Sequence, residues 1–325
     1  MSPSNPFNTL LLAAPFPKEL IQAYHIHRTN RNADQRTLHL TPTFHPTCDT
    51  ILHGLITTKA PDLRNCLVLW ARPPPHIISL ISEIQSRLSR FIHDSDFDCI
   101  KSHWNNTSSD EVKLSRPCQG AFYTPRPIEI AGGTGESGVW WMPPTHLHMT
   151  VLEALHSVTT EEVNTAISKL PHGVNDLQEI TDSLVNGARQ KVLLTSPRVG
   201  FDGSALAVGF IPVYEEDLGK GEGEKTKWYS YHHLRRDAWD EANKKGLNVQ
   251  SRYVVPSAHV TIMRYVSEDV KFVDGLERWM KGIEEVNEWL EREGDGVKWD
   301  ITGDPKGLVW RKGQLWYGGG ETVCP

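Results

Sequence analysis

The sequence predicts an α+β protein, in which antiparallel strands are mixed with helices that pack on their outer faces. Apolar runs of strand length alternate with longer segments whose apolar residues recur at helical spacing. Two predicted strands repeat one pattern, a histidine, an apolar residue, a threonine and an apolar residue, at 148–151 and 259–262. In both halves of the chain a helix and a connection precede this strand, which indicates an internal duplication of a helix and strand unit.

The composition restricts both the size of the core and the class of partner. With 325 residues, 38% hydrophobic residues and 11 Trp, the chain is long enough for one large domain or two intimate lobes. A net charge of −6 argues against a broad basic face for long nucleic acid, and favours a short or terminal phosphate substrate. The 5 Cys residues are scattered, without a C-x-x-C pair, as is typical of reduced intracellular thiols.

The sequence shows neither the pattern of a secretory leader nor that of a membrane anchor. The apolar run at 10–14 lacks a basic leading region and is cut short by Pro15 and Pro17. No window approaches the roughly 20 apolar residues that span a bilayer. We therefore expect a cytoplasmic protein without membrane contact, and a monomer, since nothing in the sequence predicts an oligomer.

Residues 1–60 are rich in Pro, Thr, His and Asn, and show little periodicity apart from a short helix at 17–24. They are interpreted as an N-terminal extension, packed on the outside of a domain that spans 61–325. This domain begins with a buried strand at 66–71. Three prolines then lead into an amphipathic helix that ends near residue 91.

The remaining elements follow in order along the chain. Thr159 and Glu162 form a predicted capping box at the start of the next helix. Beyond it the patterns predict alternating helices and strands, a terminal hairpin and polar loops. The helices are expected at 159–170, 176–185, 228–245 and 270–292, the strands at 191–195, 205–212, 307–310 and 314–317, and the loops at 94–138 and 215–227.

Each repeated pattern places one titratable group beside one hydroxyl. Residues i and i+2 of a strand share a face, so His148 lies beside Thr150 and His259 lies beside Thr261. A neutral imidazole accepts a proton from water, and a protonated one donates a proton to a leaving oxygen. Threonine hydroxyls are suited to hold phosphate oxygens. Together these groups favour the hydrolysis of an anionic ester, without a metal.

Two other interpretations stay open at this point. Either pattern taken alone is typical of a structural strand with a satisfied histidine. His146 and His148 also form a His-x-His pair that suits zinc, although the sequence supplies no obvious third ligand. His232 and His233 are predicted to lie on a polar helix face, because adjacent residues of a helix diverge by about 100 degrees.

The context of both patterns resembles a known family. The segments 143–152 and 255–265, in which a proline precedes the histidine strand, are similar to the two motifs of the two-histidine (2H) phosphoesterase superfamily. That superfamily includes the 2′,3′-cyclic nucleotide phosphodiesterases and the so-called 2′-5′ RNA ligases. The resemblance covers about residues 62–320. It implies a bilobal fold across 61–325, in which two pseudo-symmetric lobes of antiparallel sheet with outer helices surround a central groove.

Carried over residue by residue, the resemblance implies that His148 and His259 are the general acid and base. It also implies that Thr150 and Thr261 bind the substrate phosphate. The sequence does not decide which histidine acts as the base. His146 departs from the common family pattern and is a candidate for substrate contact.

Aromatic residues near the motifs are further candidates for substrate contact, because nucleotide sites often stack a base on a ring. These are Tyr265, Trp316 and Tyr317, for which core packing is the alternative. The predicted activity is hydrolysis of a nucleoside or RNA-terminal 2′,3′-cyclic phosphate, without a cofactor. The predicted partner is thus a small nucleotide or an RNA 3′ end. Alternatives are ADP-ribose 1″,2″-cyclic phosphate, a 2′-5′ oligonucleotide, or a non-catalytic module that binds RNA or nucleotides.

Overall fold

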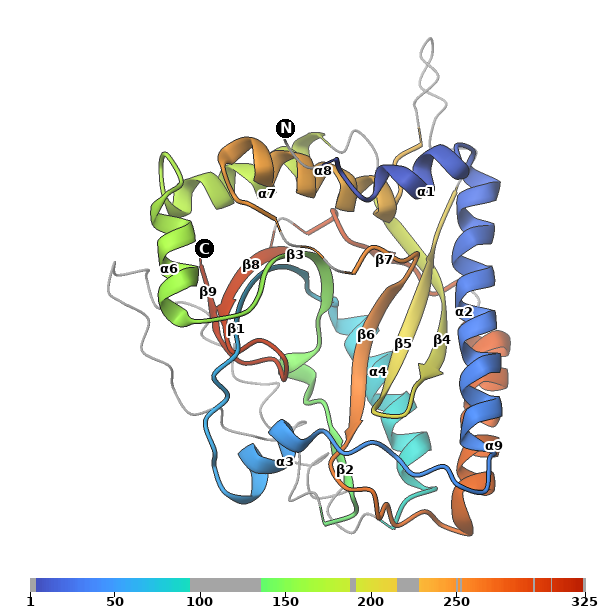
Figure 1. Cartoon of the computed structure of the whole chain (residues 1–325). Helices are drawn as coiled ribbons and strands as arrows, with labels where there is room; N and C mark the ends of the chain where they lie inside the picture. The colour runs from blue at the N-terminus through green and yellow to red at the C-terminus, as the bar shows by residue number, and fades with distance from the viewer. Residues whose placement is uncertain are drawn as a thin grey trace.

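The computed structural model describes residues 4–93, 136–187, 191–214, 228–249, 251, 253–294, 296–304 and 306–323. Within these ranges, nine strands form one antiparallel sheet that is strongly curled (Figure 1). The strands are β1 (Asn65–Ala71), β2 (Val139–Trp141), β3 (Met149–Val158), β4 (Leu193–Phe201), β5 (Ala205–Pro212), β6 (Ala258–Tyr265), β7 (Trp299–Asp300), β8 (Leu308–Gly313) and β9 (Glu321–Thr322). Helices combined with this antiparallel sheet confirm the predicted α+β class.

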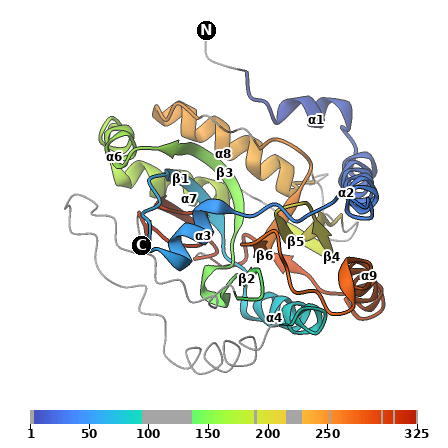
Figure 2. The same cartoon turned by 60° about the horizontal axis from the view of Figure 1, so that its bottom comes forward.

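The helices flank the two halves of the sheet. They are α1 (Asn8–Ala13), α2 (Pro17–His39), α3 (Thr50–Thr57), α4 (Pro75–Ser89), α6 (Thr160–Ser168), α7 (Val174–Gly187), α8 (Tyr231–Lys245) and α9 (Gly275–Glu293). A short 3-10 helix, η1 (Pro144–His146), lies just before β3. Helices α6, α7 and α8 contact β1, β3 or β8, whereas α2, α4 and α9 contact β4, β5 or β6 (Figure 2). Among the helices of the described ranges, none has the length and apolar character needed to cross a bilayer.

Most predicted elements lie where the patterns place them. The capping box of α6 is confirmed, because Glu162 N donates to Thr159 Oγ1 at 3.2 Å and Thr159 N donates to Glu162 Oε2 at 2.7 Å. The loop predicted at 215–227 and nearly all of the loop predicted at 94–138 lie outside the described residues. The short helix α3 and the short strands β2, β7 and β9 were not predicted, because such brief segments carry little periodicity.

The strand order places the two histidine strands side by side. The order is β7-β4-β5-β6-β3-β1-β8-β9, with β2 paired to β6, so β3 and β6 are central neighbours. Strand β1 shows how the two faces differ. Leu67 and Leu69 join the main core, whereas Val68 and Trp70 point to the opposite face, where they form a small second cluster. One face of this half of the sheet is therefore turned away from the main core.

The predicted terminal hairpin has a different second strand, because β8 pairs antiparallel with β9 and not with residues 314–317. Strand β8 continues through Arg311 and ends at Gly313, and residues 314–317 form a turn. The reason is pairing with β1, which runs along the whole of β8 and aligns Val68 with Arg311. The Arg311 guanidinium is satisfied there by donating to the carbonyls of Gly319 and Gly320 at 2.8 Å. A charged residue that breaks an apolar run in sequence thus does not break the strand.

Residues 1–60 pack into the main core instead of only on the outside. Phe7, Leu20, Tyr24 and Leu52 are each at most 1% exposed and belong to the main core cluster. Helix α2 extends to His39, well beyond the predicted residue 24. Its later turns face the sheet with polar side chains, so they lack the apolar period that marks an amphipathic helix.

The prediction of a polar helix face for His232 is also wrong. His232 is 0% exposed and lies between the rings of Phe7 and Tyr24. Its Nε2 lies 3.2 Å from the Phe7 carbonyl oxygen, which only accepts, and its Nδ1 lies 3.2 Å from the Tyr24 hydroxyl. Nε2 therefore carries a proton, which it donates to the Phe7 carbonyl. Burial first, and then the charge of Arg235, lower the pKa of His232 to about 3.

This arrangement predicts that folding stability falls as the pH falls below about 6.5, the pKa of histidine in an unfolded chain. Between that value and a folded-state pKa of about 3, the unfolded chain binds one more proton at His232. The loss from this residue should reach about 1.4 kcal/mol per pH unit. A His232→Gln variant keeps a donor for Phe7 and does not titrate, so urea unfolding at several pH values should show a slope shallower by about one proton. Equal slopes in both proteins would place the acid sensitivity elsewhere.

Candidate active site

The two repeated patterns meet at the centre of the sheet. Strands β3 and β6 are antiparallel and pair Met149 with Val260. Extending this register by one residue in each direction places His148 opposite Thr261 and Thr150 opposite His259. Cross-strand partners share a face and lie about 5 Å apart. All four side chains are half-buried, whereas the residues between them are buried. We call the side of the sheet that carries these four residues the histidine face.

An irregularity in β6 brings a further cation to this face. Thr261 pairs with Ala207 and Met263 pairs with Leu206, so β6 contains one extra residue at this point. Such a bulge shifts the alternation of side chains by one position. Arg264 is accordingly half-buried and joins the histidine face. A strict period of two would have placed it in the core, and the sequence carries no signal for the bulge.

His148 is held in one orientation and one tautomer. Its Nδ1 lies 2.7 Å from the carbonyl oxygen of His146. A carbonyl only accepts, so Nδ1 carries the proton and Nε2 presents a lone pair. The Trp70 ring stacks on the imidazole, with centroids 3.6 Å apart and planes 12° apart. The ring of His148 is thus fixed with Nε2 available to accept a proton.

The surroundings of His148 disfavour its charged form. Burial is the main cause, and the nearby cations Arg72 and Arg311 add to it, so the pKa of His148 falls to about 3. Both guanidinium groups lie against Trp70, at 5.1 and 5.2 Å from its ring. His148 is therefore neutral near pH 7. The same cations favour an anion bound beside it, and an anion would raise the pKa of the imidazole again.

His259 has a different set of partners. Its Nδ1 lies 3.1 Å from Ser257 Oγ and 3.4 Å from the Tyr253 hydroxyl. Hydroxyls both donate and accept, so they accommodate the neutral and the protonated imidazole. Burial is the main cause that lowers the pKa of His259 to about 4, followed by the charges of Arg31 and Arg235. His259 is thus free to change its protonation state while its Nδ1 stays hydrogen-bonded.

Arg235 connects the two histidine strands. This residue of α8 is 1% exposed. Its Nε donates to Val151 O on β3 at 3.1 Å, and its Nη1 donates to Val255 O at 3.0 Å, just before β6. It also donates to Tyr253 O, and Tyr253 contacts His259. One buried guanidinium thus holds the segment that follows Thr150 and the segment that precedes His259.

His146 lies at the edge of the site. It supplies the carbonyl that orients His148, and its own ring is half-buried. Burial, followed by the charges of Arg72 and Arg311, lowers the pKa of His146 to about 4. Gly318 allows this placement, since a Cβ there would lie 2.2 Å from His146 Cβ, and its φ of +83° also suits glycine.

The two tyrosines predicted as possible substrate contacts lie in the core. Tyr265 is 1% exposed, and its hydroxyl accepts from Trp279 Nε1 at 3.0 Å. Tyr317 is 0% exposed, and its hydroxyl donates to Asp49 Oδ1 at 2.7 Å and accepts from Arg64 at 3.0 Å. Their hydroxyls and rings are thus committed to packing, which is the alternative that the sequence left open. We therefore leave both out of the candidate site.

Sequence reasoning missed Trp70, Tyr253 and Arg235. Ser257, another neighbour of His259, could have been found from the sequence. It lies two residues before His259, so the two share a face of the strand. Trp70 and Arg235 come from a distant strand and a distant helix, and Tyr253 lies six residues before His259, outside β6, so no periodic pattern connects them to the motifs.

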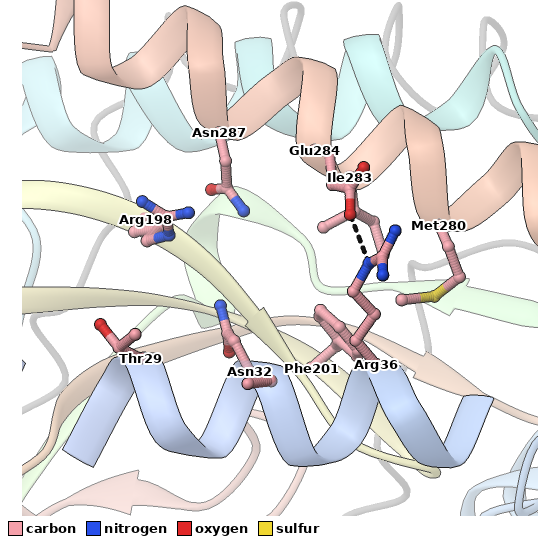
Figure 3. Close-up of a pocket in the computed structure, with 10 residues that line it drawn as sticks. Thr29, Asn32, Arg36, Arg198, Phe201, Met280, Ile283, Glu284 and Asn287 are labelled. Carbon is pink, nitrogen blue, oxygen red and sulfur yellow. Dashed lines mark hydrogen bonds and ion pairs between the residues drawn. The ribbon is translucent and has the colours of Figure 1, made fainter. Parts of the chain in front are cut away.

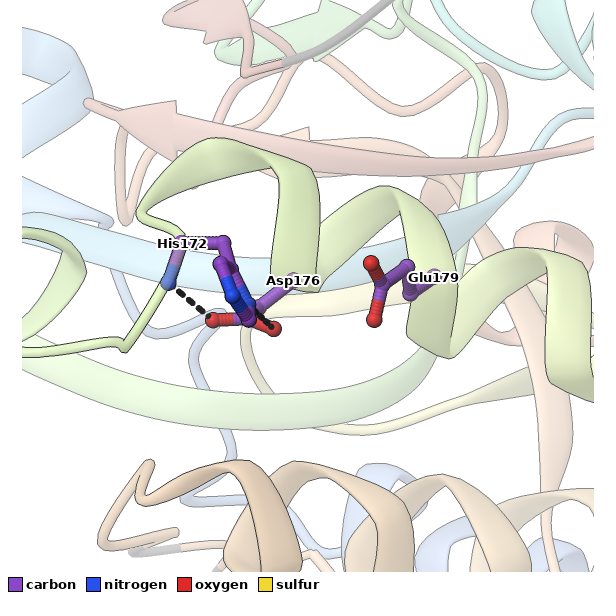
Figure 4. A group of neighbouring side chains, drawn as sticks. All are labelled: His172, Asp176 and Glu179. Atoms are coloured by element: carbon purple, nitrogen blue, oxygen red, sulfur yellow. Dashed lines mark hydrogen bonds and ion pairs between the residues drawn. The ribbon is translucent and has the colours of Figure 1, made fainter.

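A group of possible metal ligands lies away from this site. Among the described residues, one set of three such donors lies within 4.8 Å, namely His172, Asp176 and Glu179 (Figure 4). Lys245 Nζ binds Asp176 Oδ1 at 2.7 Å and also pairs with Glu179. One ammonium group thus already pairs with both carboxylates, and the three residues give no support for a metal site.

A cavity of about 280 Å³ lies between α2 and α9 at the edge of β4 (Figure 3). Its charged groups are paired, since Arg36 binds Glu284 at 2.5 Å and Arg198 binds Glu291. Asn287 donates to and accepts from the backbone of Val199 at the open edge of β4. These contacts cover the open edge of the sheet, so the residues that line the cavity have a structural role.

Comparison of the chain with family models, with curated proteins and with solved structures found no match in any of the three.

Proposed function

We propose that the protein hydrolyses a cyclic phosphodiester, most simply a nucleoside or RNA-terminal 2′,3′-cyclic phosphate. One observation carries this proposal. Strands β3 and β6 pair Met149 with Val260, and continuing this pairing by one residue each way would set each histidine opposite the threonine of the other strand. A phosphate between the strands would meet one imidazole and one hydroxyl from each side. In-line displacement at phosphorus needs such an acid and base on opposite sides.

We assign the base to His148 and the acid to His259. His148 Nε2 accepts a proton from water as the water oxygen bonds to phosphorus. The bond from phosphorus to one ribose oxygen breaks, and protonated His259 donates its Nε2 proton to that oxygen. The fixed tautomer of His148 and the adaptable partners of His259 support this order. Exchange of one proton with solvent at each ring then restores the starting state.

Charge on the histidine face supports an anionic substrate. Thr150 and Thr261 hydroxyls are the proposed ligands of the non-bridging oxygens. Arg72 and Arg311 lie against Trp70, which stacks on His148. These two cations supply local positive potential in a chain whose net charge is −6. Arg264, further along β6, is already paired with Asp49 at 3.3 Å.

The same proposal includes the fold expected from the 2H resemblance. Each histidine strand begins a row of four strands. The row β3-β1-β8-β9 lies on one side of the boundary between β3 and β6, and the row β6-β5-β4-β7 lies on the other side. We propose that these are the two related lobes. A cytoplasmic location and a monomeric state remain predictions within this proposal.

The test is hydrolysis of the four nucleoside 2′,3′-cyclic phosphates in excess chelator. We expect conversion of at least one of them to a nucleoside monophosphate, at a rate that chelator does not change. ADP-ribose 1″,2″-cyclic phosphate serves as the comparison substrate. Loss of activity in chelator would favour the zinc alternative at His146 and His148. Tight nucleotide binding without any product would favour a binding module.

A further inference from the structure

Arg72 follows the last residue of β1 and lies close to His148. It stands two residues after Trp70, which is the cross-strand partner of Thr150, so Trp70 belongs to the histidine face. The guanidinium carbon of Arg72 lies 5.1 Å from the centroid of the Trp70 ring. The His148 ring stacks on the same indole, with centroids 3.6 Å apart. Arg72 and His148 are thus held against one ring.

The backbone of Arg72 is fixed on both sides. Its N–H donates to Gly307 O at 2.7 Å, which extends the pairing of β1 with β8 by one residue. The prolines at 73–75 then lead into α4. A residue before proline is restricted to extended conformations, and each proline ring fixes its own φ angle. The site at which this side chain leaves the backbone is therefore set before any ligand binds.

The guanidinium of Arg72 keeps most of its hydrogen-bonding capacity. Within the described part of the chain, its side chain makes one hydrogen bond, from Nη1 to Thr145 O at 3.2 Å. The side chain is half-buried, so it is neither enclosed by the core nor fully in solvent. Since a guanidinium has several N–H donors in a planar fork, the others are left for water or a ligand.

Arg311 lies equally close to Trp70 but has a different role. Its guanidinium carbon is 5.2 Å from the indole centroid, and the residue is 7% exposed. It donates to the carbonyls of Gly319 and Gly320 at 2.8 Å and to Thr322 Oγ1 at 2.9 Å. Arg311 is therefore committed to the segment after β8.

The charge of Arg72 also differs from that of other arginines near these strands. Arg64 pairs with Asp62 at 2.9 Å, and Arg264 pairs with Asp49 at 3.3 Å. No carboxylate of the described residues acts on Arg72 in this way, and burial alone lowers its pKa to about 10. A partly desolvated cation without a counter-charge favours the binding of an anion.

We infer that Arg72 binds the substrate phosphate, by donating from its guanidinium to a non-bridging oxygen, an inference that rests on the proposed hydrolysis. The planar fork of arginine matches the geometry of phosphate oxygens. The hydroxyls of Thr150 and Thr261 can donate to the same oxygens, but they carry no charge. Arg72 supplies the positive charge that stabilises these oxygens while water attacks phosphorus beside His148.

The first experiment measures kcat/KM for adenosine 2′,3′-cyclic phosphate in two variants. Arg72→Ala should lower it about 100-fold, and Arg72→Lys, which keeps the charge but loses the fork, about tenfold. Guanidinium ion, added well below denaturing concentrations, should raise the activity of Arg72→Ala about tenfold and leave wild type unchanged. Activity of Arg72→Ala within about threefold of wild type would overturn the inference.

Arg87→Ala is the matched control for Arg72→Ala. The Arg87 guanidinium also lies over an indole, that of Trp289, at 4.0 Å, and it pairs with Glu83 at 2.9 Å on α4. The control therefore loses the same kind of packing between arginine and tryptophan, without a proposed contact with phosphate. Its kcat/KM should stay within about threefold of wild type.

The second experiment separates contact with phosphate from support of the turn before β3. Arg72 holds Thr145 O, and the next residue, His146, supplies the carbonyl that orients His148. A residue that only supported this turn would affect kcat and leave phosphate affinity unchanged. Calorimetry with adenosine 3′-monophosphate should instead show binding at least about tenfold weaker in Arg72→Ala than in wild type. Unchanged affinity with a lower kcat would overturn the contact.

If no cyclic phosphate is turned over, the proposed function fails and calorimetry alone decides the inference. Weaker binding of adenosine 3′-monophosphate in Arg72→Ala than in both wild type and Arg87→Ala supports phosphate binding by Arg72. Equal affinity in the three proteins, or no binding by wild type, overturns it.

Discussion

Replacement of His148 or His259 by alanine should lower kcat for a nucleoside 2′,3′-cyclic phosphate by about 10²-fold or more. Each substitution removes one of the two groups that move a proton in the proposed displacement. Since the two act in one step, the double variant should be scarcely slower than the slower single variant. Steady-state kinetics of the three variants measures this directly.

His156→Gln is the matched control for these variants. His156 lies further along β3 and pairs with Glu153 at 2.6 Å, so it shares the strand with His148 but has no proposed catalytic role. Its activity should stay within a few-fold of wild type. An equal loss in His156→Gln would point to damage of the strand, and little loss in His148→Ala would contradict the assignment of the base.

The pH dependence of kcat and kcat/KM of the wild-type protein is a second test of the two histidines. In the empty site the pKa values of His148 and His259 lie at about 3 and about 4, so kcat/KM should decline as the pH rises through the neutral range. A bound phosphate favours the imidazolium form and raises both pKa values. The maximum of kcat should therefore lie at a higher pH than that of kcat/KM.

Replacement of Arg235 should produce the second large effect. An Arg235→Met variant leaves the carbonyls of Val151, Tyr253 and Val255 without their buried donor. We expect a loss of about 3 kcal/mol or more in the free energy of unfolding, measured by urea denaturation. An unchanged stability would contradict the view that this guanidinium joins the two histidine strands.

A milder change separates positioning from folding. Arg235→Lys keeps the charge and loses the planar fork that reaches both strands. It should lower kcat about tenfold with KM little changed, because His259 loses the support of the segment before it. The adjacent Arg236→Lys is the matched control, since Arg236 is partly exposed and pairs with Asp237 at 2.6 Å. A loss of stability in Arg235→Lys without any loss of kcat would make Arg235 a purely structural residue.

The sequence by itself determined the α+β class and the two motif strands, because both follow from periods that a short segment carries. His148 lies beside Thr150, and His259 beside Thr261, whatever the rest of the chain does. The strand at 66–71 and the cap at Thr159 are local in the same sense.

The tertiary structure decided how these parts combine. That β3 and β6 are neighbours, and that Met149 of one motif pairs with Val260 of the other, depends on pairing across the sheet. The bulge that turns Arg264 to the histidine face depends on the register of β5 against β6. The burial of Tyr265, the reach of Arg235 and the hydrogen bond from Arg72 to Thr145 likewise depend on contacts between residues far apart in sequence. Such contacts leave no periodic trace in the chain, since the free energy that selects them comes from packing and hydrogen bonding that exist only in the folded molecule.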